Sequence, residues 1–452
     1  MISELKLKNV GPIQEATVPM KDLTIICGRN GVGKTYLSYS YYMFIHNFRR
    51  LLFKSVQIPE QATDSIIDMA SATEPSRKSF DIKLDDLGIS YDSISEVLKE
   101  AGKSDEIFST LEINKSENTS ISGGIEIETY ESLISAKANV GLNGSLEINL
   151  SKEEHEDTVK LTLSKEHEEE LDIDDIFADM RFIIGVFVVD YLMKLSQFPI
   201  TSERTGISLF FEDLAKIRRD FKHSAVEHYT YPRPIENNIG NMGMIKSRKY
   251  AYNHLVNDEK SSFQSQVSDI LGGSYKFEND SLYFQPKDKD VLVPLRVSSG
   301  ASKSLLLLDY FMYNYNAYGA LIIDEPELNL HLDSQKEIAR VLCSIANRGI
   351  KVVVTTHSDH FIREINNLIM LSSSNLRPEH RQAIMEKAGV KIDSVIKPNQ
   401  VSTVVLSAKE RKSFTMPVSE YGIDLKLFND EIMGNNDISS ELAMAIYEGQ
   451  NV

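Results

Sequence analysis

The chain has 452 residues, of which 42% are hydrophobic and 25% charged, and a formal net charge of −17. This composition is typical of a soluble protein of two or three domains, and its negative sign argues against a surface coated for nonspecific DNA binding. The N-terminus lacks the apolar stretch of a signal peptide, and the most apolar run, Phe182–Val189, is too short to span a bilayer and predicts a buried helix.

The negative charge is concentrated in one segment. Ser151–Met180 holds twelve acidic residues against three lysines, a charge of −9. A solvated face or a flexible edge explains such a run, and an acidic docking surface is the alternative. Two basic clusters are solvated helix faces or, alternatively, local nucleic-acid sites: Lys216, Arg218, Arg219, Lys222 and His223, and Lys246, Arg248 and Lys249.

The only two cysteines, Cys27 and Cys343, lie in an apolar run and in an expected helix. We predict that both are reduced core residues, with no disulfide framework and no thiolate metal site. Reduced thiols, with no expected membrane contact, fit a cytoplasmic location.

The first elements lead into a glycine-rich loop. Leu5, Leu7 and Val10 alternate before a turn at Gly11-Pro12, as an edge strand and hairpin would. The apolar run Leu23–Cys27 predicts a buried strand, and an aromatic-rich helix is expected over Thr35–Lys54. The order strand, glycine loop, helix is the context that a phosphate-binding loop requires.

The middle of the chain mixes helical and strand patterns. Three alternating strands are expected. A coiled coil is not expected, because the segment has no sustained apolar heptad pattern. We interpret residues 55–179 as an α+β region inserted into a discontinuous domain made of residues 1–54 and 180–452. The expected strands are Ile125–Glu128, Ser145–Leu150 and Thr158–Leu163.

A helix is expected over Ile173–Gln197, and residues 210–272 form a helical arm of the discontinuous domain. Two alternating strands follow, and a third segment leads into the sequence V-S-S-G at Val297–Gly300. We expect these strands to form an antiparallel β subdomain. They are Ser274–Phe277 and Ser281–Phe284, with Val291–Val297 as the leading segment.

The last third alternates strands and helices, which predicts an α/β fold with a mixed or parallel sheet flanked by helices. The expected strands are Ala320–Ile323, Lys351–Thr355 and Val401–Leu406. The expected helices are Ser302–Asn314, Asp333–Asn347, Phe361–Leu371 and, in large part, Leu425–Tyr447.

Gly28–Thr35 reads G-R-N-G-V-G-K-T, the pattern GxxxxGK[ST] of a phosphate loop. Gly31 and Gly33 let the backbone approach phosphates, and Lys34 can reach the β- and γ-phosphates. The Thr35 hydroxyl can ligate Mg²⁺. A glycine-rich turn without a ligand is the alternative. The candidate nucleotide-binding residues of the loop are Asn30, Gly31, Val32, Gly33, Lys34 and Thr35.

Four apolar residues, starting at Ala320, deliver Asp324 and Glu325 to the carboxyl end of an expected strand. If that strand shares a sheet with Leu23–Cys27, the carboxylates lie beside the phosphate loop. Asp324 is suited to hold Mg²⁺, and Glu325 to orient the attacking water or accept its proton. The alternative is a pair of carboxylates on a solvated turn.

Ser298, Ser299 and Gly300 precede an expected helix and offer N–H groups and hydroxyls to an anion; an ordinary helix cap is the alternative. His357 follows an expected strand and could contact a γ-phosphate, unless it is a satisfied core histidine. Gly300 precedes Asp324 by 24 residues, and Asp324 precedes His357 by 33. His357 and His360 lack a third ligand for a metal site.

In these motifs the chain resembles the ABC-type ATPase heads of SMC, Rad50 and RecF proteins and of the overcoming-lysogenization-defect nucleases. The resemblance implies that one protomer's phosphate loop and Asp324 strand bind ATP and Mg²⁺. The signature V-S-S-G of a second protomer would complete the site. His357 matches the switch histidine, and Glu325–Asp333 matches the D-loop, with Leu332 where proline is usual.

Two further positions are carried over from the resemblance. Gln197 is the best candidate for a glutamine loop. Thr201-Ser-Glu-Arg resembles the family's arginine-bearing segment, which would place Arg204 near the nucleotide or a partner.

Fewer than 100 residues follow His357, and they contain no D-x-D pair of a Toprim nuclease. The chain therefore resembles the stand-alone ATPase subunits of anti-phage systems, such as Septu, with an HNH nuclease partner, or PARIS, with a Toprim partner. The length and the G-K-T-Y-L-S-Y helix start favour the Septu type.

That resemblance implies a slow, regulatory ATPase that forms at least a head-to-head homodimer. It would control a separate nuclease or toxin subunit, with DNA or a phage protein as the trigger. The alternative is a RecF- or SMC-like ATPase that binds DNA in repair or recombination. A transporter subunit is disfavoured by the SSG signature and by the large insertion.

Overall fold

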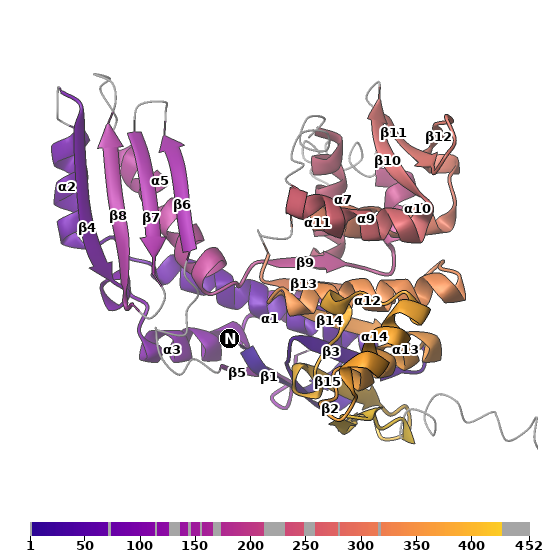
Figure 1. The fold of residues 1–452 in the computed structure, drawn as a ribbon. Helices are drawn as coiled ribbons and strands as arrows, with labels where there is room; N and C mark the ends of the chain where they lie inside the picture. The colour runs from indigo at the N-terminus through magenta and orange to yellow at the C-terminus, as the bar shows by residue number, and fades with distance from the viewer. Residues whose placement is uncertain are drawn as a thin grey trace, which may run out of the picture.

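The structure is a computed structural model (Figure 1). It describes residues 2–70, 74–113, 115–125, 136–142, 146–153, 156–165, 173–211, 231–247, 258–278, 281–314 and 318–426. The first basic cluster, two residues of the second and nearly all of the expected helix Leu425–Tyr447 lie outside these residues, as does part of the acidic segment.

A six-stranded sheet forms the centre of the molecule, in the order β16-β15-β3-β14-β13-β9. All neighbouring pairs are parallel except β15 with β16, so the sheet is mixed, as the sequence predicts. The inner strands are apolar on both faces, which is what a sheet covered by helices on both sides requires. The strands are β3 (Leu23–Gly28), β9 (Gln197–Ile200), β13 (Ala320–Asp324), β14 (Lys351–Thr356), β15 (Val401–Leu406) and β16 (Ser413–Thr415).

Alternate residues of these strands enter two different hydrophobic clusters, because successive strand side chains point to opposite faces. Ile26 of β3 and Val353 of β14 pack with α1 on one face, whereas Ile25 and Val352 pack on the other face. The helices are α1 (Lys34–Ser55) on the first face, and α11 (Leu306–Asn314), α12 (Leu332–Asn347) and α13 (Asp359–Leu371) on the second. The prediction of an α/β fold is therefore confirmed.

Both cysteines lie in the second cluster. Cys27 and Cys343 are buried and free, which confirms their prediction as reduced core residues. Burial raises the pKa of both thiols far above the usual value.

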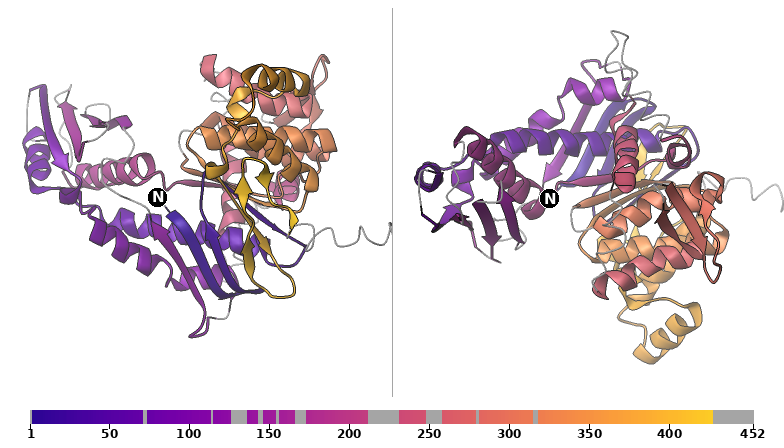
Figure 2. Two further views of the ribbon diagram at one scale, coloured as in Figure 1. Left: turned by 60° about the horizontal axis from the view of Figure 1, so that its bottom comes forward. Right: turned by 90° about the horizontal axis from the view of Figure 1, so that it is seen from above.

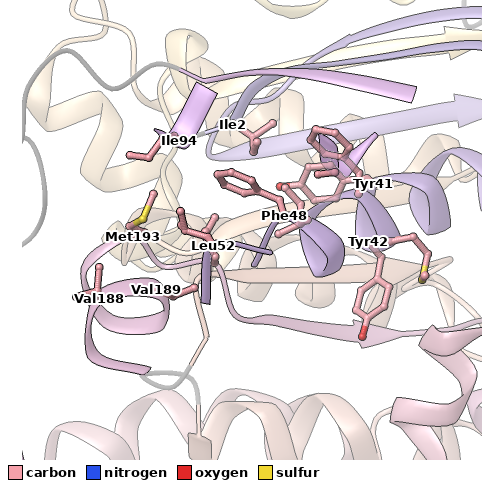
Figure 3. Packing of buried hydrophobic residues seen from close by; sticks show 14 of the residues in the cluster. Ile2, Tyr41, Tyr42, Phe48, Leu52, Ile94, Val188, Val189 and Met193 are labelled. Atoms are coloured by element: carbon pink, nitrogen blue, oxygen red, sulfur yellow. The ribbon is translucent and has the colours of Figure 1, made fainter. Parts of the chain in front are cut away.

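A second, antiparallel sheet has the order β2-β1-β5. The predicted hairpin at Gly11-Pro12 is present as β1 (Ile2–Val10) and β2 (Ile13–Pro19). Strand β5 (Ser120–Ile125) comes from the middle of the chain and pairs with β1. Figure 3 shows Phe48 and Leu52 of α1 among Ile2 and Met193 in the core that this sheet covers.

A third sheet, in the order β4-β8-β7-β6, stands away from the central sheet (Figures 1 and 2). Figure 1 shows α2 and α5 against it, while α3 packs beside α1. The strands are β4 (Ser76–Lys83), β6 (Ala136–Leu142), β7 (Leu146–Lys152) and β8 (Thr158–Lys165); the helices are α2 (Glu60–Ala70), α3 (Tyr91–Ala101), α4 (Asp105–Thr110) and α5 (Ile173–Gly185).

A helical lobe covers the β9 edge of the central sheet (Figure 1). It carries a small antiparallel sheet, β10-β11-β12, as the sequence predicts. Its elements are α7 (Arg233–Ser247), α9 (Asp258–Leu271), β10 (Gly273–Glu278), β11 (Ser281–Pro286), β12 (Val293–Pro294) and α10 (Gly300–Ser304). The exact boundaries of the inserted region and of the helical arm stay predictions.

The C-terminal part of the described chain adds small elements at the β15 side. These are α14 (Pro378–Ala388), β17 (Val418–Ser419) and β18 (Gly422–Ile423). Among the described residues, no helix has both the length and the apolarity needed to cross a membrane.

The expected single helix Ile173–Gln197 is wrong at its C-terminal half. Helix α5 ends at Gly185, a π-helical segment spans Val186–Leu192, and Gln197 begins strand β9. The run Phe182–Val189 is not wholly buried, since Phe182 is 60% exposed and packs against the Phe53 ring with the two ring planes tilted. Periodicity could not locate the break because the apolar pattern continues across it.

Two other boundaries differ from the sequence prediction. The expected helix Ser302–Asn314 is two helices, α10 and α11, separated at Leu305. The leading segment Val291–Val297 pairs as a strand only at Val293–Pro294 and then forms a 3₁₀ turn. Pro294 lacks the N–H that would continue the strand ladder.

Candidate functional site

The phosphate loop connects the central strand β3 to the long helix α1. Gly33 precedes α1 with φ 105°, and a Cβ there would lie 2.8 Å from Pro12 Cγ, so only glycine fits. No side chain caps the start of α1, and its first turn carries no acidic residue. The N–H groups of that turn therefore remain available to an anion.

Lys34 lies at the first position of α1 and is only 6% exposed. Its Nζ donates to the carbonyl oxygens of Gly28 at 2.9 Å and Arg29 at 3.1 Å. Burial lowers the pKa of the Lys34 amine, and the nearby carboxylates of Glu325 and Glu327 oppose that shift. The Lys34 amine is thus bound by two backbone carbonyl oxygens of the loop, and a phosphate oxygen can replace them as the hydrogen-bond acceptor.

Asp324 ends β13 directly opposite Thr355 of β14. The Ser38 hydroxyl of α1 donates to Asp324 Oδ1 over 2.8 Å, and the Thr355 hydroxyl donates to the same oxygen over 3.0 Å. Asp324 Oδ2 is buried and has no hydrogen-bond partner. Burial raises the pKa of Asp324 to about 6, and the two hydroxyls act in the opposite direction.

Glu325 adopts a left-handed conformation, with φ 47°. Its carboxylate Oε1 lies 3.5 Å from His357 Nδ1, and that histidine ring also lies 3.7 Å from Glu327 Oε1. The hydrogen bond between Glu325 and His357 lowers the pKa of the carboxyl and raises the pKa of the imidazole. The structure therefore pairs His357 with Glu325, and the histidine remains 46% exposed.

Glu327 is a site residue to which the sequence reasoning gave no role. Its Oε1 accepts hydrogen bonds from the Thr356 hydroxyl at 2.7 Å and from the His357 N–H at 3.2 Å. Its Oε2 is buried without a partner. The repeated acid in Glu325-Pro326-Glu327 was the available signal, because the proline turn returns the second carboxylate to the same edge.

The side chains of the signature residues Ser298 and Ser299 form hydrogen bonds within their own chain. The Ser298 hydroxyl donates to Leu295 O over 2.7 Å. Ser299 caps α10 by accepting the Ser302 N–H, which fits the helix-cap alternative for this side chain. Gly300 faces the D-loop, where an added Cβ would lie 3.2 Å from Asn329 Cβ.

Gln197 lies at the wrong end of its strand for a glutamine loop. It pairs with Ala320 at the start of β13, whereas Asp324 lies at the end of that strand. Four residues of strand span about 13 Å, so Gln197 lies at the amino edge of the sheet, away from the phosphate loop. The prediction for Gln197 is therefore wrong.

Arg204 also differs from its expected role near the nucleotide or a partner. The residue is 0% exposed, and its guanidinium donates to backbone carbonyls, including those of Asp324 at 2.7 Å and Glu325 at 2.6 Å. Arg204 thus lies behind the acidic pair rather than on the ligand side.

The residues present fit ATP with Mg²⁺. A Cβ at Gly31 would meet no atom within 4 Å, so the face of the loop is open to a phosphate. The partnerless Asp324 Oδ2 is the kind of oxygen that a divalent cation takes as a ligand. Thr35, the other expected Mg²⁺ ligand, is partly exposed in the first turn of α1.

A phosphate loop beside a strand-end acidic pair, at the carboxyl edge of parallel strands, defines the class of P-loop ATPases. The chain belongs to the family described as AAA ATPase domain (AAA_15), whose model matches residues 1–362. No curated protein matches the sequence.

Among solved structures, 128 chains match. They include an SMC head bound to the C-terminal winged-helix domain of ScpA, with 11% identity, 93% of this chain and 98% of that chain covered, and a TM-score of 0.36. The SMC head domain from Thermotoga maritima matches with 13% identity, coverage of 92% and 99%, and a TM-score of 0.31. A Pyrococcus furiosus Smc head with an extended coiled coil has 14% identity, coverage of 100% and 99%, and a TM-score of 0.33.

Proposed function

We propose that this chain is an ATP-hydrolysing subunit of ABC type that works as a nucleotide-dependent switch. Two copies clamp ATP between them, and opening or closing of that clamp controls a separate nuclease or toxin subunit in anti-phage defence. Slow turnover suits such a switch, since the lifetime of the closed clamp sets the duration of the signal.

One observation carries the ATPase part of this proposal. Lys34, Asp324 and His357 follow three neighbouring strands, β3, β13 and β14, and meet at one edge of the central sheet. There Lys34 binds phosphate oxygens, and Asp324 with Thr35 holds Mg²⁺. The metal, when bound, offsets negative charge on the phosphate oxygens.

Glu325 is the residue that orients the attacking water. Its pKa is lowered by the bond to His357, so it is ionised at neutral pH and accepts a hydrogen bond from water. His357 fixes the direction of that carboxylate and carries a half-exposed ring toward the same edge.

The second copy supplies Ser298–Gly300 in this proposal. Two features support a contact on that face: Val297 beside the signature is 68% exposed, and Leu332 at the start of α12 is 48% exposed. The cap residue Ser299 and the start of α10 follow Val297 closely in the sequence.

Control of a nuclease or toxin is supported by the motif set. The compact length and the G-K-T-Y-L-S-Y helix start resemble the stand-alone ATPase subunits of anti-phage systems of the Septu type, in which the effector is a separate protein. DNA or a phage protein is the proposed trigger.

The experiment that tests the switch is the concentration dependence of ATP hydrolysis by the purified full chain. We expect the rate per subunit to rise with protein concentration and saturate when the dimer forms. A rate per subunit that is constant down to nanomolar protein would reject the shared site. Co-purification from the native host, followed by mass spectrometry, tests the partner; a nuclease or toxin subunit is the expected companion.

Salt-dependent DNA binding by the isolated chain would instead support the repair or recombination role. Because DNA is also a proposed trigger, that outcome decides for repair only when no nuclease or toxin subunit co-purifies; the ATPase proposal then stands and the defence proposal falls.

A further inference from the structure

Arg204 is a fully buried cation whose hydrogen bonds all go to backbone carbonyls. It is 0% exposed. Its Nε donates to Ser304 O at 3.0 Å, its Nη1 to Asp324 O at 2.7 Å and Thr201 O at 3.2 Å, and its Nη2 to Glu325 O at 2.6 Å. Within the described part of the chain, no carboxylate forms an ion pair with it.

Such an arrangement is costly for a residue that only fills space. Burial lowers the pKa of Arg204 to about 10, which reflects the cost of keeping the charge out of water. The carboxylates of Glu327 and Asp324 offset part of that cost from beyond hydrogen-bond range. An apolar side chain would fill the same space without this penalty. The N–H donors of the guanidinium are therefore the feature for which arginine is needed at position 204.

Two of the four carbonyls that bind Arg204 belong to Asp324 and Glu325, the carboxylate residues at the end of β13. Glu325 has φ 47°, a left-handed backbone conformation that is strained for a residue with a side chain. Its N–H donates to Thr355 O at 3.0 Å, and its carbonyl accepts from Arg204 at 2.6 Å. Bonds on both sides of the residue therefore hold the strained backbone that directs the Glu325 carboxylate.

A third carbonyl belongs to the signature helix α10. Side chains from other elements bind each of its last three carbonyls. Tyr275 donates to Ser302 O, Ser208 donates to Lys303 O at 3.1 Å, and Arg204 donates to Ser304 O. The single hydrogen of the Ser208 hydroxyl is shared between Lys303 O and the nearer Arg204 O, which lies 2.7 Å away within the helical segment 204–211. The signature helix and Arg204 are thus held as one unit.

We propose that Arg204 is a positioning residue that couples the signature segment to the catalytic carboxylates. When Ser298–Gly300 engages the nucleotide of a second copy, the movement of α10 passes through the guanidinium to the backbone of Asp324 and Glu325. The water-orienting carboxylate is then placed correctly only in the closed dimer. This inference rests on the proposed shared ATP site.

The geometry also explains why arginine is needed. One planar guanidinium presents five donors in a fixed fork, so it can bridge carbonyls from three segments at once. A lysine keeps the charge but offers one donor centre, and it cannot bind Ser304 O and Glu325 O together. Arg204→Lys therefore cuts the coupling while leaving the cation in place.

The test measures steady-state ATP hydrolysis, ATP affinity and the melting temperature of the full chain. For Arg204→Lys we expect kcat to fall about 100-fold, as for an ångström-scale misplacement of a catalytic group, with the ATP dissociation constant changed less than about threefold. The control Arg233→Lys, in an exposed pair with Glu236, is expected to leave kcat unchanged. A wild-type kcat in Arg204→Lys overturns the proposal.

A second variant separates coupling from a loss of folding. Ser208→Ala removes one hydroxyl between Arg204 and α10 and leaves the buried charge intact. We expect a fall in kcat of about tenfold, and no additional loss when Ser208→Ala is combined with Arg204→Lys, because both act through one pathway. Losses that multiply, or an unchanged kcat in Ser208→Ala, overturn the coupling.

Measurements on the wild-type protein separate a failure of the Arg204 coupling from a failure of the shared ATP site. If it hydrolyses ATP with the expected concentration dependence while both variants behave normally, the coupling fails and the proposed function stands. If the wild-type rate shows no concentration dependence, the shared site itself fails.

Discussion

The Ser38 hydroxyl donates to Asp324 Oδ1 over 2.8 Å, across 286 residues of sequence. Ser38 lies one helical turn beyond Lys34, so the helix that binds phosphate also orients the carboxylate at the end of β13. The same hydroxyl lies 3.1 Å from Thr35 O, and its single hydrogen favours the nearer, charged acceptor. Because Oδ1 is occupied in this way, the partnerless Oδ2 is the atom left for a cation.

Replacement of Ser38 by alanine should weaken Mg²⁺ binding. The variant leaves Asp324 Oδ1 with the Thr355 hydroxyl alone, so the carboxylate is less firmly oriented. Loss of a partner that orients a metal ligand typically lowers metal affinity about 10- to 100-fold. The measurement is the Mg²⁺ concentration that gives half-maximal ATP hydrolysis. Ser40→Ala, which removes a hydroxyl bound to Tyr36 O on the same helix, is the matched control. Equal Mg²⁺ requirements in both variants would contradict the role of Ser38.

Replacement of Lys34 by alanine should remove most of the affinity for nucleotide. The amine now bridges Gly28 O and Arg29 O at the mouth of the loop, where the β- and γ-phosphates are expected. A charge-assisted hydrogen bond contributes about 1.5–3 kcal/mol, so ATP binding should weaken at least tenfold. Calorimetric titration measures the loss directly. Undiminished affinity would mean that phosphates bind elsewhere.

Replacement of Glu325 by glutamine should preserve ATP binding and abolish turnover. The amide keeps the size of the side chain but neither carries the charge nor accepts a proton from water. With hydrolysis blocked, the ATP-bound dimer should accumulate. Phosphate release and size-exclusion chromatography with ATP are the two measurements. Phosphate release at the wild-type rate would remove Glu325 from its proposed role.

The order of the motifs was enough to predict the three strands of the central sheet that carry the site. Apolar runs before Gly28, Asp324 and His357 predicted strands β3, β13 and β14, and the structure places them side by side. The sequence could not predict that β14 lies between the other two. Strand order depends on pairing between distant segments, and local periodicity carries no information on it.

The same limit applies to the site. Lys34, Asp324, Glu325 and His357 were found from motifs, because each has a recognisable local pattern. Ser38, Thr355 and Glu327 were missed, since each acts through a hydrogen bond to a residue far away in the sequence. Arg204 was expected near the nucleotide or a partner because Thr201-Ser-Glu-Arg resembles the family's arginine-bearing segment. Arg204 can be buried because four backbone carbonyls accept hydrogen bonds from its guanidinium, and only the folded chain brings these carbonyls together.

The clearest pH dependence of folding should come from His46 on α1. Burial, reinforced by the positive charge of Arg233, lowers the pKa of His46 to about 4 from 6.5, and its ring stacks on Tyr42. The folded state therefore disfavours protonation relative to the unfolded state. Stability from this residue is complete above pH 6.5 and is lost as the pH falls toward 4, by about 3 kcal/mol in total.

His46→Gln removes this titration. Between pH 6.5 and 4 we expect the slope of the free energy of unfolding against pH to decrease by about one proton, roughly 1.4 kcal/mol per pH unit. Melting temperatures measured across this range report the slope. The exposed His360→Gln, which removes a histidine from the surface of α13, is the control variant. A variant at position 46 that retains the wild-type slope would show that His46 is protonated as readily in the folded protein as in the unfolded chain.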